Sequence, residues 1–332
     1  MKKLLNGIDS VVDEMLNGMA AAHPEYLRRL DGTDALIRTG AKKTDKVVLI
    51  SGGGSGHEPA HGGYVGRGML DAAVSGAVFT SPTPDQVYEA IMAADCGKGT
   101  LLIIKNYTGD VMNFEMAADM AADEGIRVEK VIVADDVAVE NSTWTTGRRG
   151  IAGTVFVHKI AGAKAEEGAP LEQVKAVAEK VIANVRSMGM AIEPCTVPAV
   201  GKPGFELADD EVEIGIGIHG EPGTHREKIG TAQATADQLL EKIFAEGIYH
   251  EGDRVAVTIN GMGGTPLSEL YIVALRVEQV LGEKGICAAK TLVGNYMTSL
   301  EMAGFSITLL KLDGELEALL NAPADTPAFR QL

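Results

Sequence analysis

The chain has 332 residues, of which 45% are hydrophobic and 23% charged, so its composition is that of a globular protein long enough for two domains. Its 30 basic and 46 acidic residues give a formal net charge of −16 at pH 7. That charge repels nucleic-acid phosphates and anionic lipids, so we expect neither nucleic-acid nor membrane partners. Three dispersed cysteines and an N-terminus without a signal-peptide pattern favour a cytoplasmic protein.

The first half of the chain predicts alternating helices and buried strands. A first helix is expected from Asp9 to the His23-Pro24 pair. A second helix is expected to begin at Pro84, with Thr83 as N-cap and Gln86 completing a capping box. Short apolar runs predict strands, and the strand–helix–strand rhythm indicates a largely parallel sheet. The runs cover residues 46–51, 100–105 and 130–136, with a further helix over 113–124.

The second half repeats this pattern after a change in composition. A long amphipathic helix is expected from Leu171 through Met188, and a proline-rich section follows it. We therefore place a domain boundary between residues 188 and 189. The sequence predicts an α/β protein of two domains, residues 1–188 and 189–332, each with a mixed, mostly parallel sheet flanked by helices. The elements expected in the second domain are helices over 235–245 and 265–285 and strands over 254–260 and 305–312.

The stretch SGGGSGHEPAHGG, residues 51–63, partly fits several motifs. The dinucleotide pattern read from Gly52 and the nucleophile elbow around Ser55 both require glycine where His57 stands. The letters H-E-x-x-H match a zinc-protease signature, which needs both histidines on one face of a helix. Pro59 disfavours that helix, and no third ligand is evident, so we expect no metal site.

Three polar segments follow predicted strands or lie among glycines, where open parallel sheets bind ligands. They are the segment 51–57, the segment KNYTGD at 105–110, and IGIGIHGEPG at 214–223. His57 and Asp110 could serve as acid and base, and Lys105 could supply positive charge. The alternative, that each residue only satisfies the geometry of a turn, stays open. The segment GRRG at 147–150 could equally bind an anion or form a salt-bridged turn.

Seven longer motifs make nearly the whole chain, from residue 1 to about 330, similar to the dihydroxyacetone kinase subunit K family. They are SGGGSGHEP, FTSPTPDQ, LLIIKNYTGD, GRRG, CTVPAVGKP, GIGIHGEPG and FSITLL. The resemblance implies that His219 binds dihydroxyacetone covalently as a hemiaminal, that Asp110 is the general base, and that His57 is a second acid or base. It further implies that other residues hold the substrate oxygens, namely Gly54, Ser55, Gly56, Lys105 and, as a lesser candidate, Ser81.

The same resemblance sets expectations for cofactors and partners. The chain shows no nucleotide motif, so we expect no cofactor here and ADP on a separate L subunit. In the phosphoenolpyruvate-dependent system that it resembles, a phosphohistidine carrier rephosphorylates that ADP. The family's K subunits form homodimers. Some K-like relatives are dihydroxyacetone-sensing coactivators of a transcription regulator, and the sequence leaves this alternative open.

Overall fold

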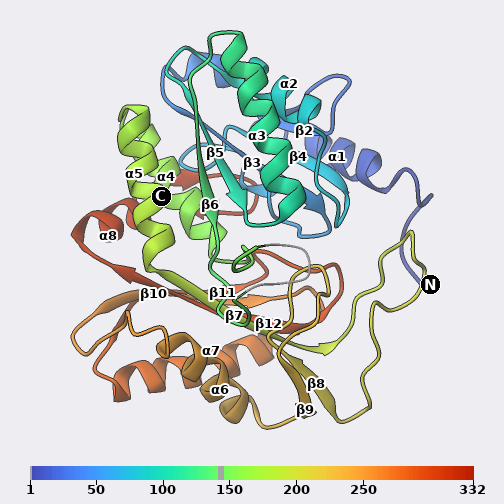
Figure 1. Ribbon diagram of the computed structural model, residues 1–332, viewed down its shortest axis with the longest axis vertical. Coiled ribbons are helices and arrows are strands. Elements are labelled where there is room, and N and C mark those ends of the chain that lie inside the picture. Colours follow the sequence, from blue (N-terminus) through green and yellow to red (C-terminus); the bar gives the residue numbers. More distant parts are fainter. Residues whose placement is uncertain (1, 141–145) are drawn as a thin grey trace. The chain divides into compact units, whose positions relative to one another are not determined.

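The computed structural model describes residues 2–140 and 146–332 and divides the chain into two compact units (Figure 1). The N-terminal unit comprises Lys2–Val133, Thr154–Ile182 and Leu316–Leu332. The C-terminal unit comprises Ala134–Gly153 and Ala183–Glu315. This division differs from the two contiguous domains expected from sequence. A boundary after residue 188 would cut a strand, because the chain changes from helix to strand at residue 185.

The described residues of the N-terminal unit form a six-stranded sheet in the order β1-β2-β4-β3-β5-β6. The strands from β4 to β6 run parallel, whereas β1 and β2 are antiparallel to their neighbours. The parallel part agrees with the strand–helix rhythm of the sequence. The strands are β1 Leu27–Arg29, β2 Ala35–Arg38, β3 Val48–Ser55, β4 Ala72–Val78, β5 Thr100–Lys105 and β6 Val128–Val133.

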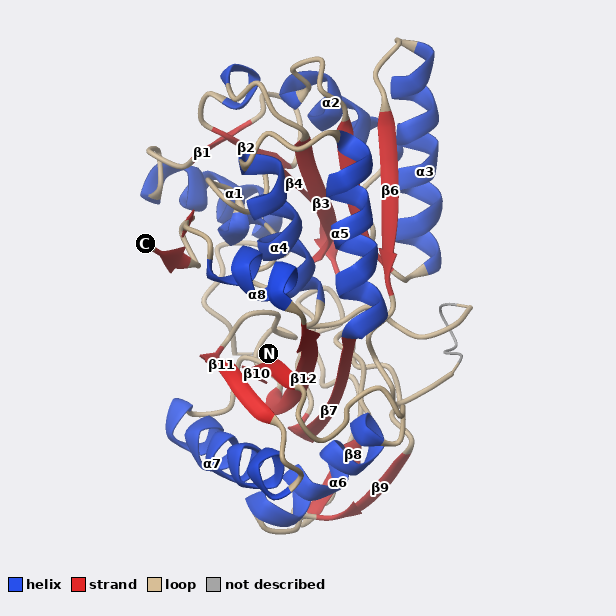
Figure 2. Ribbon diagram, turned by 90° about the vertical axis from the view of Figure 1, so that its left-hand side faces the viewer, coloured by secondary structure: helices blue, strands red, loops and turns tan. Residues whose placement is uncertain are grey.

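Helices cover this sheet because its strands are apolar on both faces (Figure 2). Side chains of α2 and α3 share a buried core with Val48, Ile50 and Leu102. Helix α4 packs against β3 and β5. The helices are α1 Val11–Ala22, α2 Pro84–Ala94, α3 Thr108–Asp123, α4 Thr154–Glu166, α5 Leu171–Asn184 and α8 Gly314–Asn321, with a small pair of strands, β13 Ala324–Asp325 and β14 Arg330–Gln331.

The C-terminal unit has a six-stranded sheet among its described residues, in the order β11-β10-β12-β7-β8-β9. Its pairing is parallel between β10 and β11 and antiparallel elsewhere, so the expectation of a mostly parallel sheet is corrected here. Apolar runs predict burial but do not encode strand direction. The elements are β7 Val185–Glu193, β8 Glu211–Ile214, β9 His225–Lys228, α6 Ala232–Phe244, β10 Arg254–Gly261, α7 Leu267–Glu283, β11 Cys287–Gly294 and β12 Ala303–Leu312.

Two predicted helices differ from the structure in ways that matter for the site. Helix α3 begins at Thr108, five residues earlier than expected, so Asp110 lies in its first turn rather than in a loop. The helix predicted from Leu171 through Met188 ends at Asn184, and Met188 lies in β7 paired with Ile307 of β12. The apolar residues at this point fit a helical spacing, but they form a strand because they pair with β12 in the sheet.

The start of α2 confirms Pro84 as its first residue but not the capping box. The Thr83 side chain makes no capping hydrogen bond, and the Gln86 side chain instead accepts a hydrogen bond from the backbone N–H of Asp34 at 3.0 Å. That contact fastens α2 to the chain before β2.

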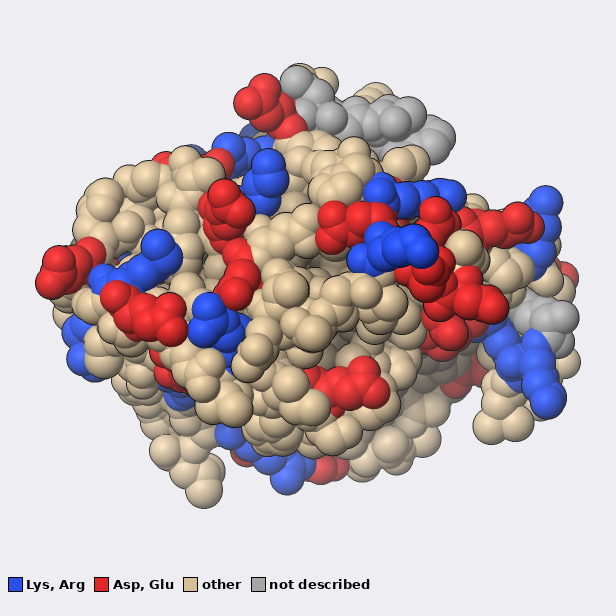
Figure 3. Space-filling model, turned by 90° about the horizontal axis from the view of Figure 1, so that it is seen from below, with Lys and Arg blue, Asp and Glu red and all other residues tan. Residues whose placement is uncertain are grey.

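On the face shown in Figure 3, acidic and basic side chains lie in mixed groups separated by uncharged surface. Among the described residues of this face, the basic side chains form no broad patch. Among the described residues, no helix combines the length and apolar character needed to cross a membrane.

Candidate functional site

The glycines after Ser51 continue strand β3 to Ser55 instead of forming the loop expected from sequence. A Cβ atom on Gly54 would lie 2.5 Å from the backbone nitrogen of Thr80. A Cβ atom on Gly53 would lie 2.5 Å from Nζ of Lys105 and 3.3 Å from Oδ2 of Asp110, and its φ is +147°. These glycines therefore let two charged side chains and a neighbouring turn approach the backbone of β3 closely.

Lys105 and Asp110 lie together beside this strand. Lys105 is the last residue of β5 and is completely buried, and its Nζ lies 3.9 Å from Oδ2 of Asp110. Asp110 is 3% exposed and lies in the first turn of α3, where the helix dipole favours an anion. Ser81 donates a hydrogen bond of 2.5 Å to its other oxygen, Oδ1. The carboxylate is thus oriented by a hydroxyl and lies near a buried ammonium group.

His57 is completely buried and stacks on Phe79, with ring centroids 5.2 Å apart and ring planes 18° apart. Phe79 has a left-handed backbone, φ +58°, and its N–H donates to the carbonyl of Ser55 at 3.0 Å. The chain thus folds back over the end of β3 and holds the imidazole ring in place. The Ser55 hydroxyl donates to the carbonyl of Gly76 at 2.7 Å, so it stabilises this turn.

Glu58 and Gly56 complete the turn that follows β3. The Gly56 N–H donates to Oε1 of Glu58 at 3.1 Å, and burial raises the pKa of this carboxyl group. Residues 56–61 form no helix, so the helical arrangement that H-E-x-x-H requires is not present.

His61 lies in a cluster with His158 and Ser51 and not in a zinc site. Its Nδ1 lies 3.0 Å from Nε2 of His158 and 3.4 Å from the hydroxyl of Ser51. Burial, together with the charge of Lys105, lowers the pKa of His158 to about 3, and the same two causes hold the pKa of His61 well below its usual value. Both rings are therefore neutral. Within the described ranges, no group of three or more His, Cys, Asp and Glu side chains could hold a metal ion.

In the C-terminal unit, His219 lies in a tight loop closed by Glu221. Its Nδ1 lies 2.9 Å from Oε1 of Glu221, and its backbone N–H donates to Oε2 of the same carboxylate at 2.9 Å. Because a carboxylate accepts hydrogen bonds, the proton of the neutral imidazole lies on Nδ1 and the lone pair on Nε2. The side chain of His219 is 17% exposed, so that a small electrophile can reach the ring.

Arg149 holds the other side of this loop. It is completely buried, and its guanidinium group donates to Oδ2 of Asp136 at 2.8 Å and to the carbonyl of Gly215 at 2.7 Å. A Cβ atom on Gly217 would lie 2.0 Å from Oε2 of Glu221 and 2.8 Å from Nη1 of Arg149. Gly217 therefore allows the guanidinium group and the carboxylate to approach one another across the backbone.

Neighbouring charged groups determine the ionisation of the Glu221 carboxyl group. Burial alone would raise the pKa of its carboxyl group, but the His219 ring and the Arg149 cation outweigh burial and lower the pKa to about 2. Glu221 and Arg149 were not singled out as site residues from the sequence. The signal for Glu221 was its position two residues after His219, whereas nothing local linked Arg149 to this loop. The GRRG segment is a salt-bridged turn, because Arg148 also pairs with Glu246 at 2.6 Å.

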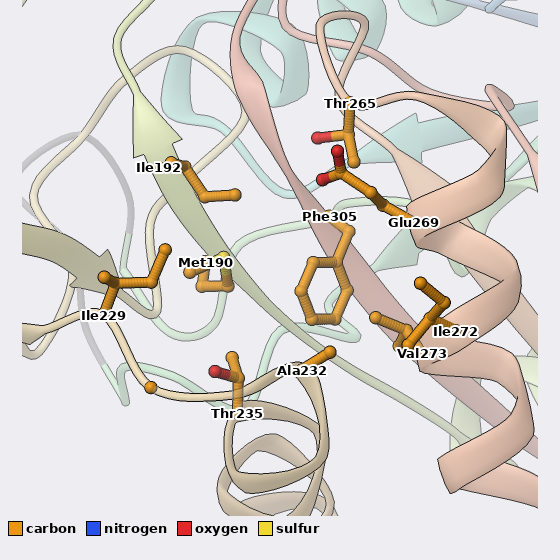
Figure 4. Close-up of a pocket in the computed structure, with 11 residues that line it drawn as sticks. Met190, Ile192, Ile229, Ala232, Thr235, Thr265, Glu269, Ile272, Val273 and Phe305 are labelled. Carbon is orange, nitrogen blue, oxygen red and sulfur yellow. The ribbon is translucent and has the colours of Figure 1, made fainter.

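An apolar pocket of about 170 Å³ in the C-terminal unit contains none of the expected site residues (Figure 4). Phe305, Met190 and Val273 form its walls, and the Glu269 carboxylate lies near Thr265 at one side (Figure 4). The structure places the candidate site residues in two separate groups, one in each unit. They are Gly54, Ser55, Gly56, His57, Ser81, Lys105 and Asp110 in the N-terminal unit, and His219 with Glu221 and Arg149 in the C-terminal unit.

Comparison with known proteins agrees with these sequence and structural features. The family model described as the Dak1 domain matches residues 17–328. The chain is 60% identical to the PTS-dependent dihydroxyacetone kinase 1, dihydroxyacetone-binding subunit DhaK, of Listeria innocua, over 99% of this chain and 100% of that protein. It is 46% identical to the PEP-dependent dihydroxyacetone kinase, dihydroxyacetone-binding subunit DhaK, of Escherichia coli, over 99% of each chain.

A solved structure has the same fold over nearly its whole length. The dihydroxyacetone kinase operon co-activator Dha-DhaQ superimposes with a TM-score of 0.90 at 38% identity, covering 96% of this chain and 98% of that chain.

Proposed function

Because this chain belongs to the Dak1 domain family, we propose that it is the dihydroxyacetone-binding subunit of a phosphoenolpyruvate-dependent dihydroxyacetone kinase, a phosphotransferase. The observation that carries this proposal is its 60% identity, over essentially the whole length, to a subunit of that description. The buried Lys105–Asp110–Ser81 group and the His219–Glu221 pair support it, because each fits one of the two chemical steps required.

The first step is covalent binding of the ketone by His219. The Nε2 lone pair attacks the carbonyl carbon, a C–N bond forms, and the carbonyl oxygen takes a proton, which we assign to His57, to become a hydroxyl group. The imidazolium that results keeps its Nδ1 proton and is stabilised by the Glu221 carboxylate, 2.9 Å away. Glycerol lacks a carbonyl group and cannot form this bond, so covalency selects the ketone over the polyol.

The second step is phosphoryl transfer to a terminal hydroxyl of the bound substrate. Asp110 takes the hydroxyl proton, the oxygen attacks the γ-phosphorus of the ATP formed on the donor subunit, and the bond from that phosphorus to ADP breaks, so that ADP leaves and dihydroxyacetone phosphate is formed. Ser81 holds the Asp110 carboxylate by its 2.5 Å hydrogen bond, and the Lys105 ammonium group stabilises negative charge beside it. We assign the backbone of Gly54 and Gly56 to holding the substrate oxygens, and Ser55 contributes through the turn it stabilises.

The phosphoryl donor in this proposal is a separate L subunit with bound ADP, which a phosphohistidine carrier rephosphorylates. This chain needs no cofactor of its own and works as a cytoplasmic homodimer. By itself it binds dihydroxyacetone without turning it over.

The proposal is tested by reconstitution and by intact-protein mass spectrometry. The purified chain should gain the mass of one dihydroxyacetone, and dihydroxyacetone phosphate should form when the L subunit, the carrier proteins and phosphoenolpyruvate are added. His219→Ala should abolish the adduct and the turnover. His225→Ala is the matched control, because its side chain is exposed and contacts only neighbours such as Thr224 and Glu227. An adduct that persists in His219→Ala would refute the covalent role.

A second candidate is a dihydroxyacetone-sensing coactivator of a transcription regulator. The observation in its favour is the TM-score of 0.90 with the solved co-activator. The two functions differ in turnover, because a sensor can keep the covalent histidine without transferring a phosphoryl group. Adduct formation without any product in the complete reconstituted system would select the sensor.

A further inference from the structure

The outer face of helix α3 carries a ridge of exposed methionines. Met112, Met116 and Met120 follow one another at intervals of four residues, so they lie along one line on the helix surface. Their residues are 57%, 53% and 37% exposed. Methionine side chains are flexible and polarisable, which suits them to contact a partner surface without fixed complementarity.

A second ridge, of acidic residues, runs beside the methionines. Glu115, Asp119 and Asp123 share the same interval of four and are each offset by three residues from a methionine. Glu115 is half-exposed and forms an ion pair with Lys130, whereas Asp119 and Asp123 face solvent. An apolar ridge bordered by carboxylates is complementary to apolar side chains bordered by Lys or Arg.

Helix α3 connects this surface directly to the candidate site. Its opposite face carries Asp110, Phe114, Ala117 and Ala121, all of them buried. Met112 therefore lies two residues after the proposed general base, on the outside of the same helix. Figure 2 shows α3 at the edge of the N-terminal unit beside β6, and its three methionines are exposed.

We propose that the methionine ridge and the adjacent acidic ridge of α3 are the docking surface for the phosphoryl-donor protein, which presents apolar side chains bordered by basic ones. This inference rests on the proposed kinase function, because the donor must bring its phosphoryl group to a substrate hydroxyl near Asp110. The net charge of −16 agrees with a partner that is basic where it docks.

The size of the surface fits a partner that binds and leaves in every cycle. From Met112 to Asp123 the helix is about 17 Å long, at 1.5 Å per residue. One helix face of that length is smaller than a whole specific interface, so it would form one part of a contact of the small size found in transient complexes. Acidic side chains at its border would speed association at low ionic strength and lose that effect in salt.

The test measures phosphoryl transfer at varied concentrations of the purified L subunit of the same organism, with full-length protein. Met116→Asp should raise the KM for the L subunit about tenfold and leave kcat and the dihydroxyacetone adduct unchanged, because it removes contact at the middle of the ridge. Asp119→Lys should raise the same KM several-fold and flatten its dependence on ionic strength. Val200→Asp is the matched control, since Val200 is 57% exposed and lies in the other unit.

The outcomes separate this inference from the proposed function. Normal transfer with an unchanged KM in Met116→Asp and Asp119→Lys would overturn the docking surface and leave the kinase function intact. No transfer by the unmodified protein in the complete system would overturn the function itself. If Val200→Asp raised the KM as much as Met116→Asp, the effect would be one of general charge, and the docking surface would be rejected.

Discussion

The two glycine-rich segments that carry His57 and His219 hold their histidines by different means. His57 lies at the end of β3, completely buried, and is fixed by packing: Phe79 stacks on it, and the backbone of a neighbouring turn lies against Gly54. His219 is partly exposed and is fixed by charge, through Glu221 and the buried Arg149. A ring held by packing keeps its position, whereas a ring held by a carboxylate also keeps a defined proton. The second arrangement is the one suited to a nucleophile.

Asp110→Asn should have the largest effect, and it should reduce turnover without changing adduct formation on His219. The variant keeps the shape of the side chain but cannot take the hydroxyl proton, so we expect turnover to fall about 10²–10⁴-fold. The dihydroxyacetone adduct on His219 should persist at full occupancy in mass spectra. Turnover equal to that of the unmodified protein would remove Asp110 as the base.

A pH titration of stability should show the contribution of the Glu221 charge, in the group of residues around His219. The pKa of Glu221 is about 2 in the folded protein against 4.5 as its ordinary value. A lowered pKa stabilises the fold above pH 4.5, and that contribution, about 3 kcal/mol, is lost as the pH falls from 4.5 through 2. We expect the free energy of unfolding in urea to fall more steeply with acid in the unmodified protein than in Glu221→Gln. Parallel curves would show that the charge contributes nothing to stability.

Glu221→Gln should also weaken adduct formation, because a neutral amide stabilises the positively charged imidazole ring of the adduct less than the carboxylate does. Losing a hydrogen bond to a charged group corresponds to about a 10–100-fold lower affinity for dihydroxyacetone. The measurement is the adduct fraction at graded ketone concentrations, with Glu246→Gln as a control for a carboxylate elsewhere in the C-terminal unit. Full adduct formation in Glu221→Gln at low ketone concentration would show that the charge of Glu221 does not stabilise the adduct.

Ser81→Ala should have the smallest effect of the series. It removes the 2.5 Å hydrogen bond that orients Asp110, but Lys105 remains beside the carboxylate. We expect kcat to fall about fivefold with adduct formation unaffected, since a hydrogen bond of this kind contributes on the order of 1 kcal/mol. A loss as large as that of Asp110→Asn would mean that Ser81 itself takes part in proton transfer.

The sequence predicted the strand that ends at Lys105 but not the contacts around His219, for physical reasons. The β5 strand matched residues 100–105, because a continuous apolar run in an α/β chain has few alternatives to a buried strand. Asp110 was expected in a loop because propensity does not reveal that α3 starts at Thr108. Arg149 reaches Gly215 across 66 residues, and no local pattern can report such a contact.

Strand direction and strand boundaries could likewise not be predicted from local sequence patterns. Val185 and Met188 fit a helix by spacing, but in the fold they pair with Leu310 and Ile307 of β12. Tertiary pairing overrides local periodicity wherever both fit the same residues. The mostly antiparallel pairing of the C-terminal sheet was missed for the same reason, because pairing partners are distant in sequence.

The discontinuity of the N-terminal unit has a consequence for how the protein is made. Residues 316–332 follow the whole C-terminal unit in sequence, yet they complete the N-terminal one: Leu319 accepts a hydrogen bond of 2.7 Å from Lys159, and the Ala328 N–H donates to the carbonyl of Gly63 at 2.9 Å. At a synthesis rate of about 5–20 residues per second, a ribosome would need on the order of ten seconds to cover residues 183–315. During that interval the N-terminal unit, which includes Asp110, remains incomplete, because residues 316–332 have not yet been synthesised.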